Sequence, residues 1–132
     1  MEKLIKSNNY KPQLLAGVFF LGTAVMLGAF GAHALKQHLS EKYLETFQTG
    51  VTYQYYHGLA LLFLGLLSKQ FTSLNTNLSF YSFSVGILLF CFNCYLYATT
   101  QTKIFAMIVP FGGILFIIGW CGLFYQLYRK IQ

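Results

Sequence analysis

The chain has 132 residues, of which 56% are hydrophobic and only 9% are charged. An ordinary soluble domain carries about a quarter charged residues to cover its surface, so this composition excludes one. Lys and Arg outnumber the acidic residues nine to three, which gives a formal net charge of +6. The basic residues lie at the ends of apolar segments and form no patch, so they do not indicate nucleic-acid binding. We therefore expect the lipid bilayer to surround most of the protein.

Four long apolar segments predict an all-α fold. We expect a bundle of four transmembrane helices that forms a single integral membrane domain over residues 1–132. The predicted spans cover about residues 14–32, 51–67, 78–98 and 104–128. The first span also resembles a secretory signal peptide, because lysines precede it and Ala32-His33-Ala34 ends it. It is longer than the roughly 7 to 15 apolar residues of such peptides, so we expect it to be retained.

The connection over residues 35–48 predicts a short amphipathic helix at the membrane interface, between the first and second spans. Its charged residues alternate with apolar residues that recur at helical spacing, namely Leu35, Leu39, Tyr43, Leu44 and Phe47. Ser40, followed by Glu41, is a plausible N-cap from which a helix runs on into the second span. Tyr53 is then expected near the lipid headgroups.

The distribution of basic residues predicts the orientation in the membrane. With four spans, both termini and the second connection share one side, which holds Lys3, Lys6, Lys11, Lys69, Arg129 and Lys130. The other side holds only Lys36, Lys42 and Lys103. Because cytoplasmic loops carry the excess of Lys and Arg, both termini are expected in the cytoplasm.

The second span carries the most polar face. A helix advances about 100° per residue, which places six residues on one side: Gly50, Gln54, His57, Gly58, Leu61 and Gly65. Lipid cannot satisfy such a face, so we expect it to turn toward other helices. At about 1.5 Å per residue, His57, Asn93 and Pro110 are each predicted about 8 to 10 Å below the outer surface, with Gly28 at similar depth.

This predicted polar layer has two interpretations. Buried Gln, Asn and His side chains join membrane helices by hydrogen bonds worth on the order of 1 kcal/mol each. Ionisable groups in a membrane also mark functional sites, so the layer is a candidate small-molecule site or pathway. The candidate binding residues are His57, Gln54, Tyr53, Asn93 and His33. A haem held by His33 and His57 requires the first helix to break, so we expect no cofactor and no metal.

Small residues indicate where helices pack closely. Ala24, Gly28 and Ala32 are spaced four apart in the first span, a pattern that lets helix backbones approach. The glycines expected at helix contacts are Gly28, Gly31, Gly58, Gly112 and Gly113. No acidic residue lies inside a span, and the spans contain no carboxylate pair or nucleophile motif. We therefore expect no catalytic residues, and an enzyme is not the favoured interpretation.

Three motifs resemble those of the YgdD/YwdK family. They are Leu27-Gly-Ala-Phe-Gly-Ala-His33, then Gln48-Thr-Gly50 with Tyr53-Gln54 and His57, then Pro110-x-Gly112-Gly113 with Gly119-Trp120. The third span departs from that family, whose members tend to carry small residues and Ser where this chain has Cys91, Phe92 and Asn93. The resemblance implies a four-span protein of the bacterial inner membrane, with relatives in mitochondria-bearing organisms. It implies no reaction, substrate or cofactor.

Two functions follow as hypotheses. The first is a non-enzymatic accessory or scaffold protein of a membrane assembly, which associates with itself or with a larger complex. The second is a permeation protein for a small molecule or ion, with an outward-facing polar site at His57 and Gln54.

Overall fold

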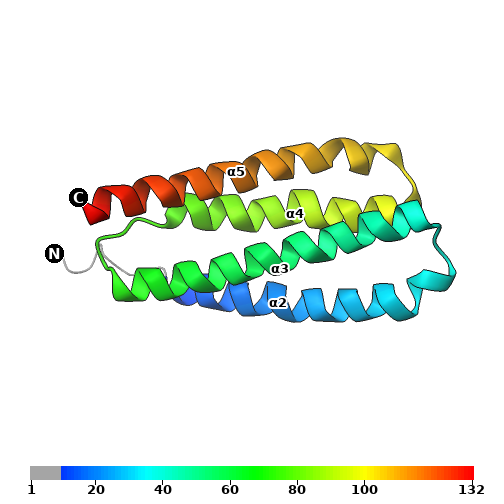
Figure 1. Cartoon of the computed structure of the whole chain (residues 1–132), viewed down its shortest axis with the longest axis horizontal. Helices are drawn as coiled ribbons and strands as arrows, with labels where there is room; N and C mark the ends of the chain where they lie inside the picture. The colour runs from blue at the N-terminus through cyan, green and yellow to red at the C-terminus, as the bar shows by residue number, and fades with distance from the viewer. Residues whose placement is uncertain (1–9) are drawn as a thin grey trace.

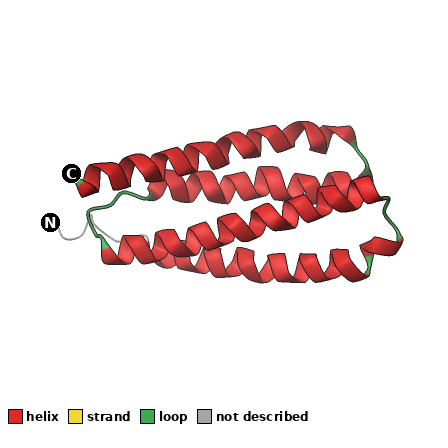
Figure 2. Ribbon diagram, in the orientation of Figure 1, coloured by secondary structure: helices red, strands yellow, loops and turns green. Residues whose placement is uncertain are grey.

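The computed structural model describes residues 10–132, and within this range the chain is helical with no strand (Figures 1 and 2). The long helices are α2 (Tyr10–His33), α3 (Glu41–Gln70), α4 (Asn77–Thr100) and α5 (Lys103–Ile131). A single 3-10 turn, η1 (Leu35–Gln37), follows α2. The predicted all-helical fold with four long helices is confirmed. The predicted basic N-terminal segment with Lys3 and Lys6 lies outside the described residues.

Three of these helices are long and apolar enough to cross a membrane. They are the segments Tyr10–Gln37, Asn77–Thr100 and Lys103–Ile131. α3 is not among them. Its middle is less apolar because Gln54 and His57 lie there together with three tyrosines.

The segment predicted as an interfacial helix is divided between two elements. Residues 35–37 form only η1, and the residues from Glu41 onward are the first turns of α3 itself. Ser40 occupies the N-cap position with an extended backbone, but its side chain makes no capping hydrogen bond. The amphipathic residues therefore extend α3 ten residues beyond the predicted start of the second span at residue 51.

The helices form a row in which each packs extensively against its neighbours in the chain. Figure 1 shows α5, α4, α3 and α2 in this order, with consecutive helices antiparallel. Short connections impose the order, because α4 and α5 are joined by residues 101–102 alone. Gln101 makes this turn with a φ of 57°, and its N–H donates to the Tyr97 carbonyl.

Glycines set the closest contacts between helices. A Cβ on Gly17 would lie 2.7 Å from the Leu62 backbone nitrogen, and one on Gly112 would lie 2.4 Å from that of Phe90. Gly112 was one of the five predicted packing glycines, and of the other four, Gly31 and Gly58 also lie against side chains of the neighbouring helix. Gly28 approaches Val51 less closely, and Gly113 has room for a Cβ. Glycine therefore fixes the α2/α3 and α4/α5 distances, as expected where packing drives association.

The outer faces of the row are apolar. Large hydrophobic side chains are more than half exposed along α2 and α5, among them Leu15, Met26, Met107, Ile117 and Phe124. Such continuous apolar exposure is incompatible with water and is satisfied by acyl chains.

Candidate functional site

The polar face of α3 turns inward, as predicted. Gln54 is fully buried and His57 is 4% exposed, and the four remaining members of the face are buried as well. The two polar side chains nevertheless face different helices. Gln54 contacts α2 and α4, whereas His57 contacts α4 and α5.

Gln54 links three helices by hydrogen bonds. Its Nε2 donates to the Phe20 carbonyl at 2.9 Å and to the Thr23 hydroxyl at 2.8 Å, both on α2. Its Oε1 accepts a hydrogen bond of 2.7 Å from the Tyr95 hydroxyl on α4. Both N–H groups of the amide and one lone pair of its oxygen are therefore used, which identifies Gln54 as a packing residue.

The hydrogen bonds of His57 define its protonation state. Nδ1 lies 2.8 Å from the Tyr53 carbonyl, and Nε2 lies 3.2 Å from Nε1 of Trp120. A carbonyl can only accept and an indole N–H can only donate, so Nδ1 carries the proton and Nε2 is bare. His57 is therefore a neutral imidazole, and protonation of Nε2 would break the bond to Trp120.

Aromatic contacts hold the imidazole in place. It stacks on the Phe116 ring with a centroid separation of 3.5 Å and an interplanar angle of 8°. Phe83 lies 5.4 Å away, centroid to centroid. With both nitrogens bonded and one ring face covered, His57 is fixed rather than free to move a proton or an ion.

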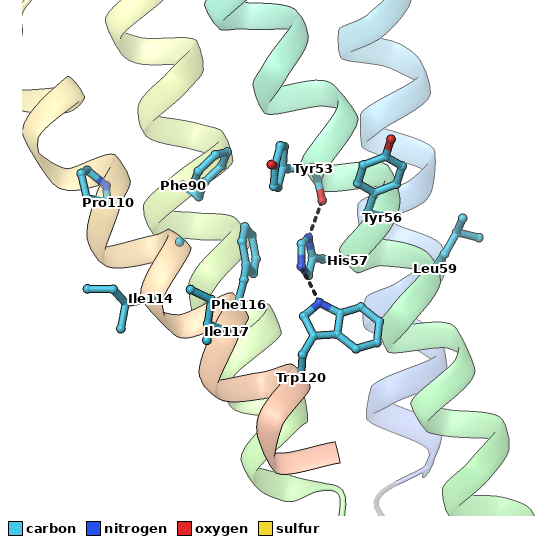
Figure 3. A pocket seen from close by; sticks show the side chains of 11 residues that line it. Tyr53, Tyr56, His57, Leu59, Phe90, Pro110, Ile114, Phe116, Ile117 and Trp120 are labelled. Atoms are coloured by element: carbon cyan, nitrogen blue, oxygen red, sulfur yellow. Dashed lines mark hydrogen bonds between the residues drawn. The ribbon is translucent and has the colours of Figure 1, made fainter. Parts of the chain in front are cut away.

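The ring stack borders a groove between α3 and α5 with a cavity volume of about 810 Å³ (Figure 3). Three elements line it, as the side chains of Tyr53, Tyr56, His57, Leu59, Phe90, Pro110, Ile114, Phe116, Ile117 and Trp120 and the backbone of Gly113. α4 contributes only Phe90, so the groove opens sideways, between two helices that are not neighbours in the chain. Its size is that of a ligand pocket, and its lining is aromatic and aliphatic.

The structure brings together only part of the predicted site. Tyr53 and His57 both line the groove, whereas Gln54 faces away from it. Asn93 donates to the Leu89 carbonyl of its own helix at 2.9 Å and does not reach His57. His33 is exposed at the end of α2, about 18 Å along the helix axes from His57. A haem held by these two histidines is therefore excluded by their separation.

The prediction of one shared polar level is wrong for His57. Gly28 lies against Val51, Gly50 lies against Cys91 and Cys94, and Gly112 lies against Phe90. These contacts place Gly28, Asn93 and Pro110 near the level of Val51. His57 is six residues further along α3, about 9 Å deeper. The error arises because the depth of His57 was counted from residue 51, the predicted start of the span, whereas α3 extends ten residues further, to Glu41.

Sequence reasoning missed Phe116 and Trp120 as partners of His57. The available signal was the single tryptophan of the chain, which falls in the middle of a span instead of the interfacial belt. It also missed a second polar cluster, in which Gln13 donates to Thr76 at 2.8 Å and Ser68 donates to Gln13 at 2.9 Å. Thr76 and Ser68 are 2.6 Å apart and close the ring.

Comparison with known proteins gives the family. Residues 27–113 match the family described as "Protein of unknown function (DUF423)". The chain belongs to the DUF423 family. The match to the DUF423 proteins includes all of α3 and α4, and it ends before Phe116 and Trp120.

Curated relatives of this DUF423 chain are named membrane proteins. The UPF0382 membrane protein of Staphylococcus epidermidis is 45% identical over 107 residues, which cover 81% of this chain and 87% of that protein. SSP2132 of Staphylococcus saprophyticus is 44% identical, with coverages of 81% and 88%. SH2409 of Staphylococcus haemolyticus is 38% identical over 118 residues, with coverages of 89% and 96%. No solved structure matches the chain.

These relatives and the apolar helices agree on the class of protein. The DUF423 chain is a multi-pass membrane protein of a family without an assigned function. The lipid bilayer is therefore its surroundings.

Proposed function

We propose that this DUF423 protein is a non-enzymatic accessory protein of the bacterial cytoplasmic membrane that holds an apolar molecule in the α3–α5 groove. The observation that carries the proposal is the groove of about 810 Å³, with its aromatic and aliphatic lining and the fixed His57–Phe116 stack. A site without free charges binds by apolar contact and shape. The same features oppose permeation, because both nitrogens of His57 are already bonded.

Four membrane crossings are part of this proposal. α3 has 30 residues, about 45 Å of helix, which exceeds the roughly 30 Å of a hydrocarbon core. Its charged residues Glu41, Lys42, Glu45 and Lys69 all lie near its ends. α3 is also packed between α2 and α4, both of which meet the requirements for a span. A helix held between two crossing helices of similar length crosses with them.

We also propose that both termini are cytoplasmic. The start of α2, the connection between α3 and α4 and the end of α5 lie at one end of the row (Figure 1). That end carries Lys11, Lys69, Arg129 and Lys130. The opposite end carries Lys36, Lys42 and Lys103. The excess of basic residues supports the cytoplasmic assignment, and the Leu27–His33 motif supports kinship with the inner-membrane YgdD/YwdK proteins.

Assembly with a second copy or with another membrane protein is the accompanying candidate. α2 and α5 are the edges of the row, and each has one extensive helix neighbour. Their free faces are therefore available to other helices. A lone monomer in mild detergent, with no partner retained after chemical cross-linking in the membrane, would contradict this role.

Lipid retention tests the groove. Gly113 lines it, and a Cβ there would meet nothing closer than 3.9 Å, so Gly113→Phe fills the space without disturbing the helix contact. Gly22→Phe is the matched control, because a Cβ on Gly22 would meet nothing within 4 Å and no residue of α2 lines the groove. Native mass spectrometry after delipidation should show a bound lipid in the wild type and the control, and its loss in Gly113→Phe. Equal retention in all three proteins would overturn the proposal.

A further inference from the structure

The apolar groove continues into a polar hollow at its outer end. A second cavity of about 390 Å³ is lined by Glu45, Gln48, Thr49, Thr52 and Tyr53. Tyr53 lines both this hollow and the α3–α5 groove. One side of α3 therefore offers an apolar space and, directly above it, a polar one. This is the shape of a site for an amphiphile.

The polar hollow combines one carboxylate with hydroxyl groups and the Gln48 amide. Glu45 is exposed and carries a carboxylate, which has no donor partner among residues 10–132. The Thr49 hydroxyl donates to the Glu45 carbonyl at 2.9 Å, so only its lone pairs face outward. A negative charge and bare acceptors favour a group that is positive and donates hydrogen bonds.

α5 carries a positive charge, Lys103, at a height similar to that of Glu45, although Lys103 lines neither cavity. His57 stacks on Phe116, which aligns α3 with α5 at that depth. Glu45 precedes His57 by 12 residues, about 18 Å of helix, and Lys103 precedes Phe116 by 13, about 20 Å. Glu45 on α3 and Lys103 on α5 thus lie at similar heights beyond the end of the groove, where a spanning helix would reach the lipid headgroups.

We propose that the groove and the hollow together bind one zwitterionic phospholipid whose head bears a primary ammonium group. Its acyl chain lies in the α3–α5 groove, its ammonium group donates to Glu45, and its phosphate lies toward Lys103. A quaternary ammonium has no N–H to donate, and an anionic glycerol head is repelled by Glu45. The inference rests on the proposed binding role of the groove and adds the chemical class of the ligand.

Quenching of tryptophan emission measures this selectivity. Trp120 is the only tryptophan of the chain and lines the groove, so brominated acyl chains that enter the groove quench its emission. The full chain is reconstituted in vesicles that contain a brominated phospholipid with an ethanolamine, a choline or a glycerol head. We expect the ethanolamine lipid to bind about two- to fivefold more strongly than the other two, the range of a partly exposed ion pair.

Two variants test whether Glu45 causes the preference for the ethanolamine head. Glu45→Gln should abolish the preference for the ethanolamine head while quenching itself persists, because the groove is intact. Glu41→Gln, which removes an exposed carboxylate one turn earlier and outside the hollow, should leave the preference unchanged. Equal binding of the three heads by the wild type would overturn the assignment, as would an unchanged preference in Glu45→Gln.

The failure of this inference is distinguishable from failure of the proposed function. Loss of lipid retention in Gly113→Phe together with no head preference would overturn only the ammonium assignment. Equal retention in Gly113→Phe and in the wild type would overturn both.

Discussion

Gln54 and His57 lie one turn apart on α3, yet the two sides of the helix that they occupy are built differently. The Gln54 side is closed by hydrogen bonds, which join α2, α3 and α4 through Phe20, Thr23 and Tyr95. The His57 side is closed by a ring stack on Phe116 and leaves a groove beside it. Polar residues of similar burial therefore join helices on one side and border the groove on the other.

The difference follows from where the neighbouring helices stand. α2 and α4 pack directly on α3, so the Gln54 amide meets partners at hydrogen-bond distance. α5 packs extensively on α4, and the rings of Phe116 and Trp120 reach from it to His57 on α3. Side chains that bridge two non-adjacent helices leave space between them, whereas glycine contacts between adjacent helices do not.

The largest loss of stability should come from a substitution that forces α2 away from α3 on the Gln54 side. In Gly17→Val the new Cβ would meet the backbone of Leu62 at 2.7 Å, and backbone cannot move aside. We expect the free energy of unfolding to fall by about 3 kcal/mol. Denaturation in SDS, followed by Trp120 emission, measures it. Gly22→Val makes the same change on the open face of α2 and should cost almost nothing, so equal losses would show that crowding is not the cause.

A smaller loss of stability is expected when only the hydrogen bonds of Gln54 are removed. Gln54→Leu keeps the volume but deprives the Tyr95 hydroxyl of its acceptor and ends both bonds to α2. The free energy of unfolding should fall by about 2 kcal/mol in the same SDS denaturation assay. Because Gln54 does not line the groove, lipid retention by the folded variant should remain. Lost retention would indicate that the two sides are coupled.

The smallest loss of stability should follow from replacing His57. His57→Phe retains a ring that stacks on Phe116 but ends the bonds to the Tyr53 carbonyl and to Trp120. We expect a loss of about 1 kcal/mol. The single indole N–H resonance of the chain should shift in NMR spectra, because Trp120 loses its acceptor. An unmoved resonance would contradict the neutral tautomer assigned to His57.

The sequence by itself determined the class of the protein and the inward face of α3. The class follows from composition, because charged residues are too few to cover a water-exposed surface. The inward face follows from local periodicity, because the spacing of Gly50, Gln54, His57 and Gly65 matches the helical repeat. The long helices were predictable for the same reason.

Only the tertiary structure decided which residues meet across helices. The contact of His57 with Trp120 joins residues that are 63 positions apart in the chain, and it depends on the relative axial positions of α3 and α5. α3 begins at Glu41, so a depth counted from residue 51, the predicted start of the span, is too small by ten residues, or about 15 Å of helix. The tertiary structure also decided that α5 packs on α4 and not on α3, which is why a groove lies between α3 and α5.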